Sequence, residues 1–555
     1  MRETEVVTLR FPYGGQAQLE ATSEQSARTT IEGLNMRAWD HVAKRVRGSS
    51  RPGITKFASD PVSGGDRVQD ITSVVTSLTS ATSPTSMQVR TITNVAVAGG
   101  DIRKFTAAGF TVPTNGTGAL SADAPVIFSA DMNGVIYFVD GTTFKKFTVA
   151  SNTVATWSAS AGSLPVNGSD APRLIERWRG RIVLSGIKSE AHNWYMSAVD
   201  DATDFDYAPT TERETQAVAG NNSPAGTVGQ PVTALIPFSD DLLIMGCDHS
   251  IWLMQGDPMA NGRLMAVTDS IGIAWGRAWC KNSAGDVYFV GSRGGLFRWN
   301  ASSSQPVRIS DGRLDGMLEE VDFETHIVRL VWSDEFQGVH GFITPVGSGS
   351  PTVQNGFWYD QRSDFFCQDR YGDVGHAPIC LYAFDGDSPE DRVVMLGCRD
   401  GYIRQLSSDA TTDDGEVIRS YVWLGPIQLQ QPGVPFVVAE LQGVLSSDSA
   451  QVDCSLSTGD SAEAAWANRD TAVLVGSFTT PRSLCFQPRL RGCAAYVKLS
   501  FEGTQVRLLE DGEKRLTETG EYRISEGAYG TAGTWAFEHL QAKLAKVVTS
   551  RQRRA

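Results

Sequence analysis

The residues whose types could do chemistry are the acids, histidines and cysteines of the chain. Four carboxylates crowd one short segment, at Asp385, Asp387, Glu390 and Asp391. Several carboxylate oxygens in one loop could hold Ca²⁺, which prefers oxygen ligands. Their spacing departs from that of an EF-hand loop, so we favour an acidic surface loop over a calcium site and predict no metal.

Histidines and cysteines form no recognisable catalytic or metal-binding pattern. The chain has 7 histidines and 8 cysteines, yet no CxxC pair and no two histidines at ligand spacing on one predicted element. Phosphate-binding loops, dinucleotide fingerprints and GxSxG elbows are also absent. Paired acids for glycoside hydrolysis can come from separate strands and leave no local pattern. We therefore expect no cofactor and no enzyme, with a glycan hydrolase kept as an alternative.

The charge balance argues against a protein whose main function is to bind nucleic acid. The chain carries 49 Lys and Arg against 63 Asp and Glu, a formal net charge of −14. Binding to DNA or RNA relies on basic side chains that neutralise phosphates, so this excess of acid disfavours that task. The first residues lack a basic stretch followed by an apolar run, and no apolar run approaches about 20 residues. Neither a signal peptide nor a membrane span is predicted.

A basic segment near the N-terminus is the candidate assembly surface. It contains Arg37, Lys44, Arg45, Arg47 and Arg51 and ends in an Arg-Pro-Gly turn. Residues 15–47 also form the best helical candidate of the chain. The segment could pair with acidic surfaces on an adaptor or a neighbouring copy, or it could be a solvated helix face, and both interpretations stay open.

One pattern recurs from about residue 90, and it predicts the fold. An apolar strand is followed by a turn rich in Gly, Asp or Ser and then by a second strand with an aromatic residue. These strands start near residues 92, 135, 182, 242, 286, 339 and 393, with gaps of 43, 47, 60, 44, 53 and 54 residues. A four-stranded propeller blade needs roughly 40–50 residues. We predict an all-β protein with a propeller-like core of about six blades, possibly seven; hairpins in a sandwich are the alternative.

The spacing of the repeats divides the chain into three parts. Residues 1–90 are predicted as an N-terminal assembly segment and linker, and residues 91–414 as the propeller. Residues 415–555 are predicted as a β-sandwich-like domain with a short helix at 535–544. That last part ends in a basic tail at 551–554, which is solvated charge or docks on an acidic partner or DNA.

Several segments resemble the nozzle or tail-hub proteins of short-tailed bacteriophages, the class of tail tubular and packaged-DNA stabilisation proteins. The runs NMRAWD at residues 35–40 and RGSSRPGI at 47–54 resemble the N-terminal pattern of that family. RGRIVLSG at 179–186, VTALIPFSD at 232–240 and FWYD at 357–360 resemble later parts, as does RLRGCAAYVK at 489–498. Together these runs cover most of the chain in the order expected for that family.

The resemblance implies a structural protein of the virion tail, assembled in the bacterial cytoplasm. It implies a ring, expected to hold six copies, below the portal and adaptor proteins and in contact with other tail components such as fibres or spikes. Genome DNA would pass through the ring without sequence specificity, and an acidic lining would let phosphates slide. A receptor-binding or glycan-degrading propeller of the tail, and a cellular propeller scaffold, are the alternative functions.

Overall fold

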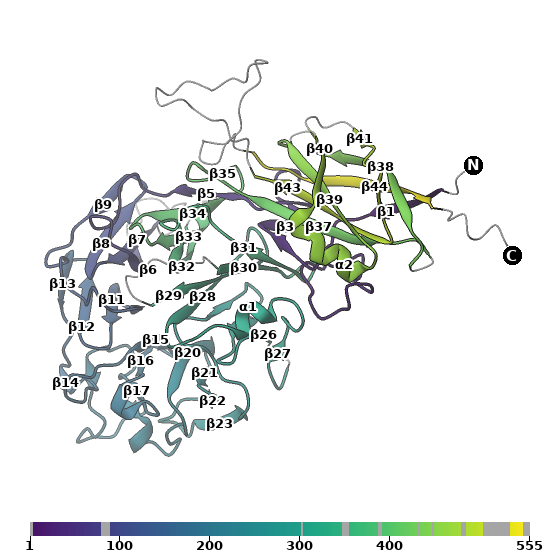
Figure 1. Cartoon of the computed structure of the whole chain (residues 1–555). Coiled ribbons are helices and arrows are strands. Elements are labelled where there is room, and N and C mark those ends of the chain that lie inside the picture. Colours follow the sequence, from purple (N-terminus) through teal and green to yellow (C-terminus); the bar gives the residue numbers. More distant parts are fainter. Residues whose placement is uncertain are drawn as a thin grey trace, which may run out of the picture.

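The computed structural model describes residues 4–78, 89–300, 303–346, 355–386, 391–430, 433–446, 449–478, 484–502 and 533–547. Strands dominate these residues, and the helices are short. Figure 1 shows two parts, a disc of small sheets and a group of longer strands that includes both ends of the chain. We call the disc the propeller and the second part the platform.

The propeller is a ring of seven four-stranded antiparallel blades within the described residues; five are separate sheets, and the last two are the first four strands of a nine-stranded and a six-stranded sheet. Blade one holds β6 (Val68–Leu78), β7 (Val89–Ala98), β8 (Asp101–Thr106) and β9 (Gly109–Thr111). Blade two holds β10 (Phe128–Met132), β11 (Val135–Val139), β12 (Phe144–Thr148) and β13 (Thr153–Thr156). Blade three holds β15 (Leu174–Trp178), β16 (Arg181–Ser185), β17 (Trp194–Met196) and β19 (Val218–Ala219). Blade four holds β20 (Val232–Ser239), β21 (Leu242–Cys247), β22 (Ile251–Gln255) and β23 (Arg263–Thr268).

The remaining three blades follow the same order of strands from the axis outwards. Blade five holds β24 (Trp279–Lys281), β25 (Val287–Val290), β26 (Leu296–Trp299) and β27 (Val307–Arg308). Blade six holds β28 (His326–Ser333), β29 (Gly338–Pro345), β30 (Asn355–Asp360) and β31 (Phe365–Asp369). Blade seven holds β32 (Pro378–Asp385), β33 (Arg392–Cys398) and β34 (Ile403–Ser407), and its fourth strand is β5 (Gly53–Lys56).

The seven predicted repeats coincide with the second strand of each blade. Their predicted starts fall on or next to β7, β11, β16, β21, β25, β29 and β33. A second strand is buried on both faces by the two adjacent blades: in β11, Ile136 belongs to the apolar core shared with blade one and Tyr137 to the core shared with blade three. Such strands read as continuous apolar runs. The all-β propeller fold is therefore confirmed, with seven blades where the weak first copy had favoured about six.

Strand β5, which precedes blade one in the sequence, closes the ring by completing blade seven. Strand β5 pairs antiparallel with β34, so that Ile54 lies opposite Leu406, and the chain then enters blade one at β6. Blades seven and one share an apolar core that includes Ile71 and Met395. Because both edges of the ring meet inside one blade, opening the ring requires breaking a sheet.

The platform consists of two sheets that pack on each other. One has the order β1 (Thr4–Leu9), β44 (Phe537–Lys546), β38 (Phe436–Leu445) and β41 (Leu484–Phe486), with β42 (Leu490–Gly492) also on β38. The other runs through β2 (Gly33–Leu34), β37 (Ser420–Ile427), β43 (Ala494–Phe501), β39 (Val452–Gly459) and β40 (Val473–Phe478). Helix α2 (Ala462–Ala467) and the hairpin of β3 (Met36–Asp40) and β4 (Arg45–Ser50) complete it.

A continuous sheet joins the platform to the propeller. Strand β31, the outermost strand of blade six, pairs with β2, which in turn pairs with β37 of the platform. One apolar core spans the joint, since Trp358 and Leu396 of the blades belong to the same cluster as Phe436 and Leu544 of the platform. The two parts are therefore held by hydrogen bonds and by shared packing, without a flexible linker between them.

The smaller elements lie between or beside the sheets. They comprise the two-stranded pair β14 (Ala161–Gly162) and β18 (Asp204–Phe205), the hairpin β35 (Thr412–Asp413) and β36 (Glu416–Val417), helix α1 (Asp315–Glu319), and short 3-10 turns at Lys188–Glu190, Gly220–Asn222 and Asn468–Thr471. Among the described residues, no helix has the length or the apolar character that crossing a bilayer would require.

Three expectations about the chain ends differ from the structure. Residues 15–47 form turns and short strands in place of a helix, because distant segments supply their hydrogen bonds: Gln16 donates its backbone N–H to Phe366. The helix expected at 535–544 is replaced by strand β44, which pairs with both β1 and β38. The propeller begins at β5 and β6, so the predicted boundary at residue 90 cuts through β7.

Candidate functional site

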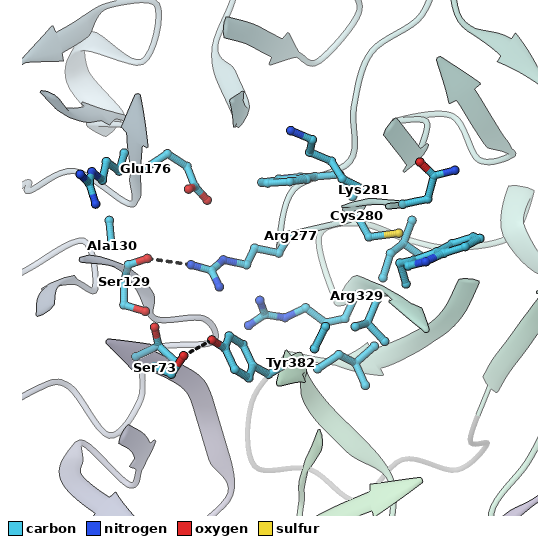
Figure 2. A pocket seen from close by; sticks show the side chains of 18 of the residues that line it. Ser73, Ser129, Ala130, Glu176, Arg277, Cys280, Lys281, Arg329 and Tyr382 are labelled. Atoms are coloured by element: carbon cyan, nitrogen blue, oxygen red, sulfur yellow. Dashed lines mark hydrogen bonds between the residues drawn. The ribbon is translucent and has the colours of Figure 1, made fainter. Parts of the chain in front are cut away.

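The candidate site is a cavity of about 520 Å³ on the axis of the propeller. Its walls come from the innermost strands β6, β10, β15, β24, β28 and β32, which pack around the axis. The free edge of each innermost strand faces the axis, so unpaired backbone groups need partners there. Figure 2 shows that two long basic side chains, Arg277 and Arg329, extend side by side into this space.

Arg329 is a buried cation with little compensation. It lies in β28 and is only 3% exposed. One terminal nitrogen donates a long hydrogen bond of 3.5 Å to the backbone oxygen of Gln69, and Nε has no partner. No ion pair of Arg329 occurs among the described side chains. Burial lowers the pKa of Arg329 to about 10, and the positive charge of Arg277 acts in the same direction.

Arg277 lies beside Arg329 and has more partners. It donates a hydrogen bond of 2.9 Å to the backbone oxygen of Ser129, and its Nη1 lies 3.8 Å from a carboxylate oxygen of Asp70. Its Nε is buried without a partner. Both guanidinium carbons stack over the ring of Phe128, at 5.3 Å for Arg277 and 6.0 Å for Arg329. The shared ring places two positive charges in one small volume.

Two acids face the arginines, and burial raises the pKa of each. Asp70 is 2% exposed and accepts a hydrogen bond of 2.6 Å from the hydroxyl of Ser129. Burial raises its pKa in spite of the nearby positive charge of Arg277. Glu176 is half-buried, and burial raises its pKa to about 7, against the attraction of Arg277 and helped by repulsion from Asp70. Glu176 therefore titrates much closer to neutral pH than an ordinary glutamate.

Polar and aromatic groups complete the walls. The hydroxyls of Ser73 and Tyr382 are hydrogen-bonded to each other across β6 and β32 (Figure 2). Lys281 donates to the backbone oxygen atoms of Pro237 and Phe238, at 2.8 and 3.0 Å. Trp279 and Trp332 are also among the lining residues. The cavity thus combines buried positive charge, hydroxyl groups and aromatic surface, which is a composition suited to a small molecule.

The basic residues predicted as an assembly surface separate into two groups. Arg37 makes a two-pronged ion pair with Asp369, at 2.8 and 2.6 Å, and Arg51 makes one with Asp413. Both arginines are buried, at 5% and 1% exposure, so neither offers its charge to a partner. They hold the joint between platform and propeller.

The other three basic residues lie on or near the turn of the β3–β4 hairpin. Arg47 is half-buried and pairs with Asp40 and Glu538 of its own chain. Lys44 and Arg45 are exposed. Only Lys44 and Arg45 remain available as charged contacts for a partner, and the prediction of an assembly surface is kept for them.

The acidic segment near residue 390 shows no metal site in the part that the structure describes. Asp387 and Glu390 lie outside the described residues. Asp385 ends β32 and lies 3.5 Å from Arg392, with both side chains exposed. Within the described ranges, no group of three or more potential ligand residues is arranged to hold a metal ion. The basic tail at 551–554 also lies outside the described residues.

The sequence patterns above include none of the axial residues, although the sequence contains one signal for them. Arg329 is a single charged residue in the otherwise apolar run IVRLVW at 327–332 of β28. A charge in a strand buried on both faces needs a partner or a cavity. Arg277 has no comparable signal, because it lies in the connection before β24 and reaches the axis only through the arrangement of the blades.

The chain shares its strand arrangement with solved structures of low sequence identity. No family model and no curated protein sequence matches the chain. Among solved structures, similarity is found to the extracellular domain of the hybrid two-component system BT3049 of B. thetaiotaomicron, at 10% identity and a TM-score of 0.41. It covers 72% of this chain and 46% of that one. A structure of YCF48 bound to D1 peptide has 10% identity and a TM-score of 0.36, covering 63% and 94%. The chain thus spans less than half the length of the BT3049 domain.

Proposed function

We propose that this protein is a structural component of the tail of a short-tailed bacteriophage, a nozzle or hub that assembles as a ring below the portal and adaptor. In this role it makes and breaks no covalent bond. Six copies surround a bore through which genome DNA passes without sequence specificity, and other tail components attach to the ring. The ordered resemblance of the sequence segments suggested this function, and one structural feature supports it.

That feature is the pair of open sheet edges in the platform. Among the described strands, β1 ends one sheet and β40 ends the other. Val6 on β1 is exposed, and Val473 and Leu474 on β40 are 51% and 59% exposed. An exposed edge with apolar side chains is a template for pairing with another chain. If the edge of one copy meets a different surface of the next, and the rotation between copies closes, such contacts generate a ring.

The charges of the β3–β4 hairpin also fit contacts between copies. The β3–β4 hairpin carries exposed Lys44 and Arg45, flanked by the exposed valines Val42 and Val46. The whole chain carries a net charge of −14. The basic residues of this hairpin can therefore form ion pairs with acidic side chains on the surface of a neighbouring copy. We assign this hairpin to contacts with a neighbouring copy or an adaptor protein.

In this arrangement DNA must pass through the central bore of the ring of copies, and not along the axis of a single propeller. The axial cavity has a volume of about 520 Å³, and Arg277, Arg329 and Tyr382 extend into it. Duplex DNA has a major groove that alone is about 12 Å wide. A duplex therefore does not fit the axis of one protomer, and only a ring of protomers provides a bore of sufficient width. An acidic lining of that bore would let DNA slide.

Electron microscopy of the purified full-length protein, alone and mixed with the portal complex, tests the proposal. We expect rings with a bore wide enough for duplex DNA. The double variant Val473→Asp with Leu474→Asp should give single protomers, because two charges on the edge of β40 oppose its burial. Val112→Asp, an exposed valine beyond β9 of blade one, is the matched control and should leave the rings intact. A wild-type protein that stays monomeric even with the portal complex would refute the assignment.

A further inference from the structure

The structure assigns a second role to the propeller: we propose that its axial cavity binds a small organic carboxylate between Arg277 and Arg329. This role is distinct from ring assembly: the cavity lies on the axis of the propeller, whereas the edges proposed for assembly belong to the platform. The inference rests on the unmatched charge of Arg329, on the size of the cavity and on the chemistry of its walls.

The unmatched charge requires an anion. Arg329 has five N–H donors, yet its guanidinium makes one hydrogen bond at 3.5 Å and no ion pair among the described residues. Asp70 attracts Arg329 at longer range, but it makes no ion pair with it: its carboxylate lies 3.8 Å from Arg277 and accepts a hydrogen bond from Ser129. A buried charge without a counter-ion is costly, and the planar fork of a guanidinium matches a carboxylate in two parallel hydrogen bonds.

The two arginines are arranged to bind one ligand together. Both stack on Phe128, and Figure 2 shows both guanidinium groups directed to the same side of the cavity, toward Ser129 and Ser73. Each retains a buried Nε atom without a partner. The hydroxyl groups of Ser73 and Tyr382 lie on the same side, where they can donate to or accept from the ligand.

The volume and the walls favour an organic anion over a bare inorganic one. A cavity of about 520 Å³ far exceeds the roughly 30 Å³ that one water occupies in the liquid. It falls in the range of about 300–1,000 Å³ that is usual for small-molecule sites. Trp279, Trp332 and Leu381 supply apolar surface for a carbon skeleton. The arginines then fix the carboxylate, and the aromatic side chains contact the remainder.

Calorimetric titration of the full-length protein with sodium acetate, succinate, citrate and phosphate, at pH 6 and constant ionic strength, tests this assignment. We expect one carboxylate per chain to bind, with phosphate weaker. Arg329→Gln should weaken the carboxylate by about ten-fold to a hundred-fold, because a charge-assisted hydrogen bond is lost. Arg329→Lys keeps the charge but loses the planar fork, so its loss should be smaller. Arg392→Gln, an exposed arginine of β33 outside the cavity, is the matched control and should bind as the wild type does.

Three results would overturn the proposal. They are the absence of binding by all three carboxylates, binding that Arg329→Gln and Arg329→Lys leave unchanged, and binding of phosphate at least as tight as that of the best carboxylate. The last result would assign the cavity to an inorganic anion. Circular dichroism of each variant establishes that it is folded, and Arg329→Lys carries the test if Arg329→Gln does not fold. Ring formation in the microscope is a separate readout, so loss of the anion site and loss of assembly are distinguishable.

Discussion

Buried arginines occur in two regions of this molecule, and the regions differ in whether the buried charge has an ion-pair partner. At the joint between platform and propeller, Arg51 is enclosed by Asp413, by the side-chain oxygen of Asn35 at 3.0 Å and by the ring of Tyr371 at 4.5 Å. Burial alone would lower the pKa of Arg51, but the charge and hydrogen bonds of Asp413 outweigh burial and raise it. At the axis, Arg329 is equally buried, yet its pKa falls to about 10.

This contrast distinguishes a charge that is neutralised within the fold from a charge that a bound ligand would neutralise. A buried ion pair with satisfied hydrogen bonds fixes the geometry of its surroundings, and removing one partner leaves the other charge stranded. A buried cation without a partner destabilises the fold in the absence of a ligand, and stability alone does not explain its presence. Three predictions sharpen the comparison, from the largest expected effect to the smallest.

Removing the charge at the joint should have the largest effect. Arg51→Met leaves Asp413, which is fully buried, without a counter-ion, and should lower the free energy of unfolding by about 3–5 kcal/mol. Urea denaturation measures this. Arg298→Met in blade five is the control, because Arg298 is about one-third exposed in its pair with Asp286 and should cost about 1 kcal/mol or less. Equal losses in the two variants would contradict a special role for the joint.

The second effect concerns Glu176 and its dependence on pH. Because the pKa of Glu176 is raised from 4.5 to about 7, the folded protein holds this proton more tightly than the unfolded chain. Its stability relative to Glu176→Gln should therefore fall as pH rises from about 4.5 to 7 and then stay level. The wild type should be about 1–3 kcal/mol less stable than the variant at pH 8, and nearly equal to it at pH 4.5.

Denaturation curves of both proteins across that pH range measure this difference. Arg277, Asp70, Asp131 and Arg177 also act on Glu176, and they are present in both proteins, so their own titration largely cancels. A difference that is independent of pH would show that Glu176 titrates normally in the folded state.

The smallest effect is expected at Arg329 itself. Arg329→Met removes a buried charge that has no ion-pair partner among the described residues and replaces it with an apolar side chain of similar length. The free energy of unfolding without ligand should stay the same or rise by up to about 2 kcal/mol, opposite in sign to Arg51→Met. Thermal or urea denaturation in ligand-free buffer measures it. A loss as large as that of Arg51→Met would place Arg329 with the structural arginines.

The sequence by itself determined the blades. Their second strands are buried on both faces, so each appears as a local apolar run followed by a turn, as residues 135–139 and 287–290 do. A pattern confined to a few neighbouring residues can be recognised in the sequence without any knowledge of the fold. The same locality explains the error at 535–544, where Leu540 and Leu544 fit a helical spacing but are buried by pairing with β1 and β38.

Only the tertiary structure decided how the ring closes and which charges have partners. Strand β5 completes blade seven by pairing with β34, a contact between segments about 350 residues apart that no local pattern encodes. Arg37 and Arg51 appeared as parts of a solvated or assembling segment, yet their carboxylate partners lie 332 and 362 residues further along the chain. Arg277 and Arg329 become neighbours only when blades five and six are placed around the axis. Electrostatic partnership depends on distance in space, and sequence separation carries almost no information about it.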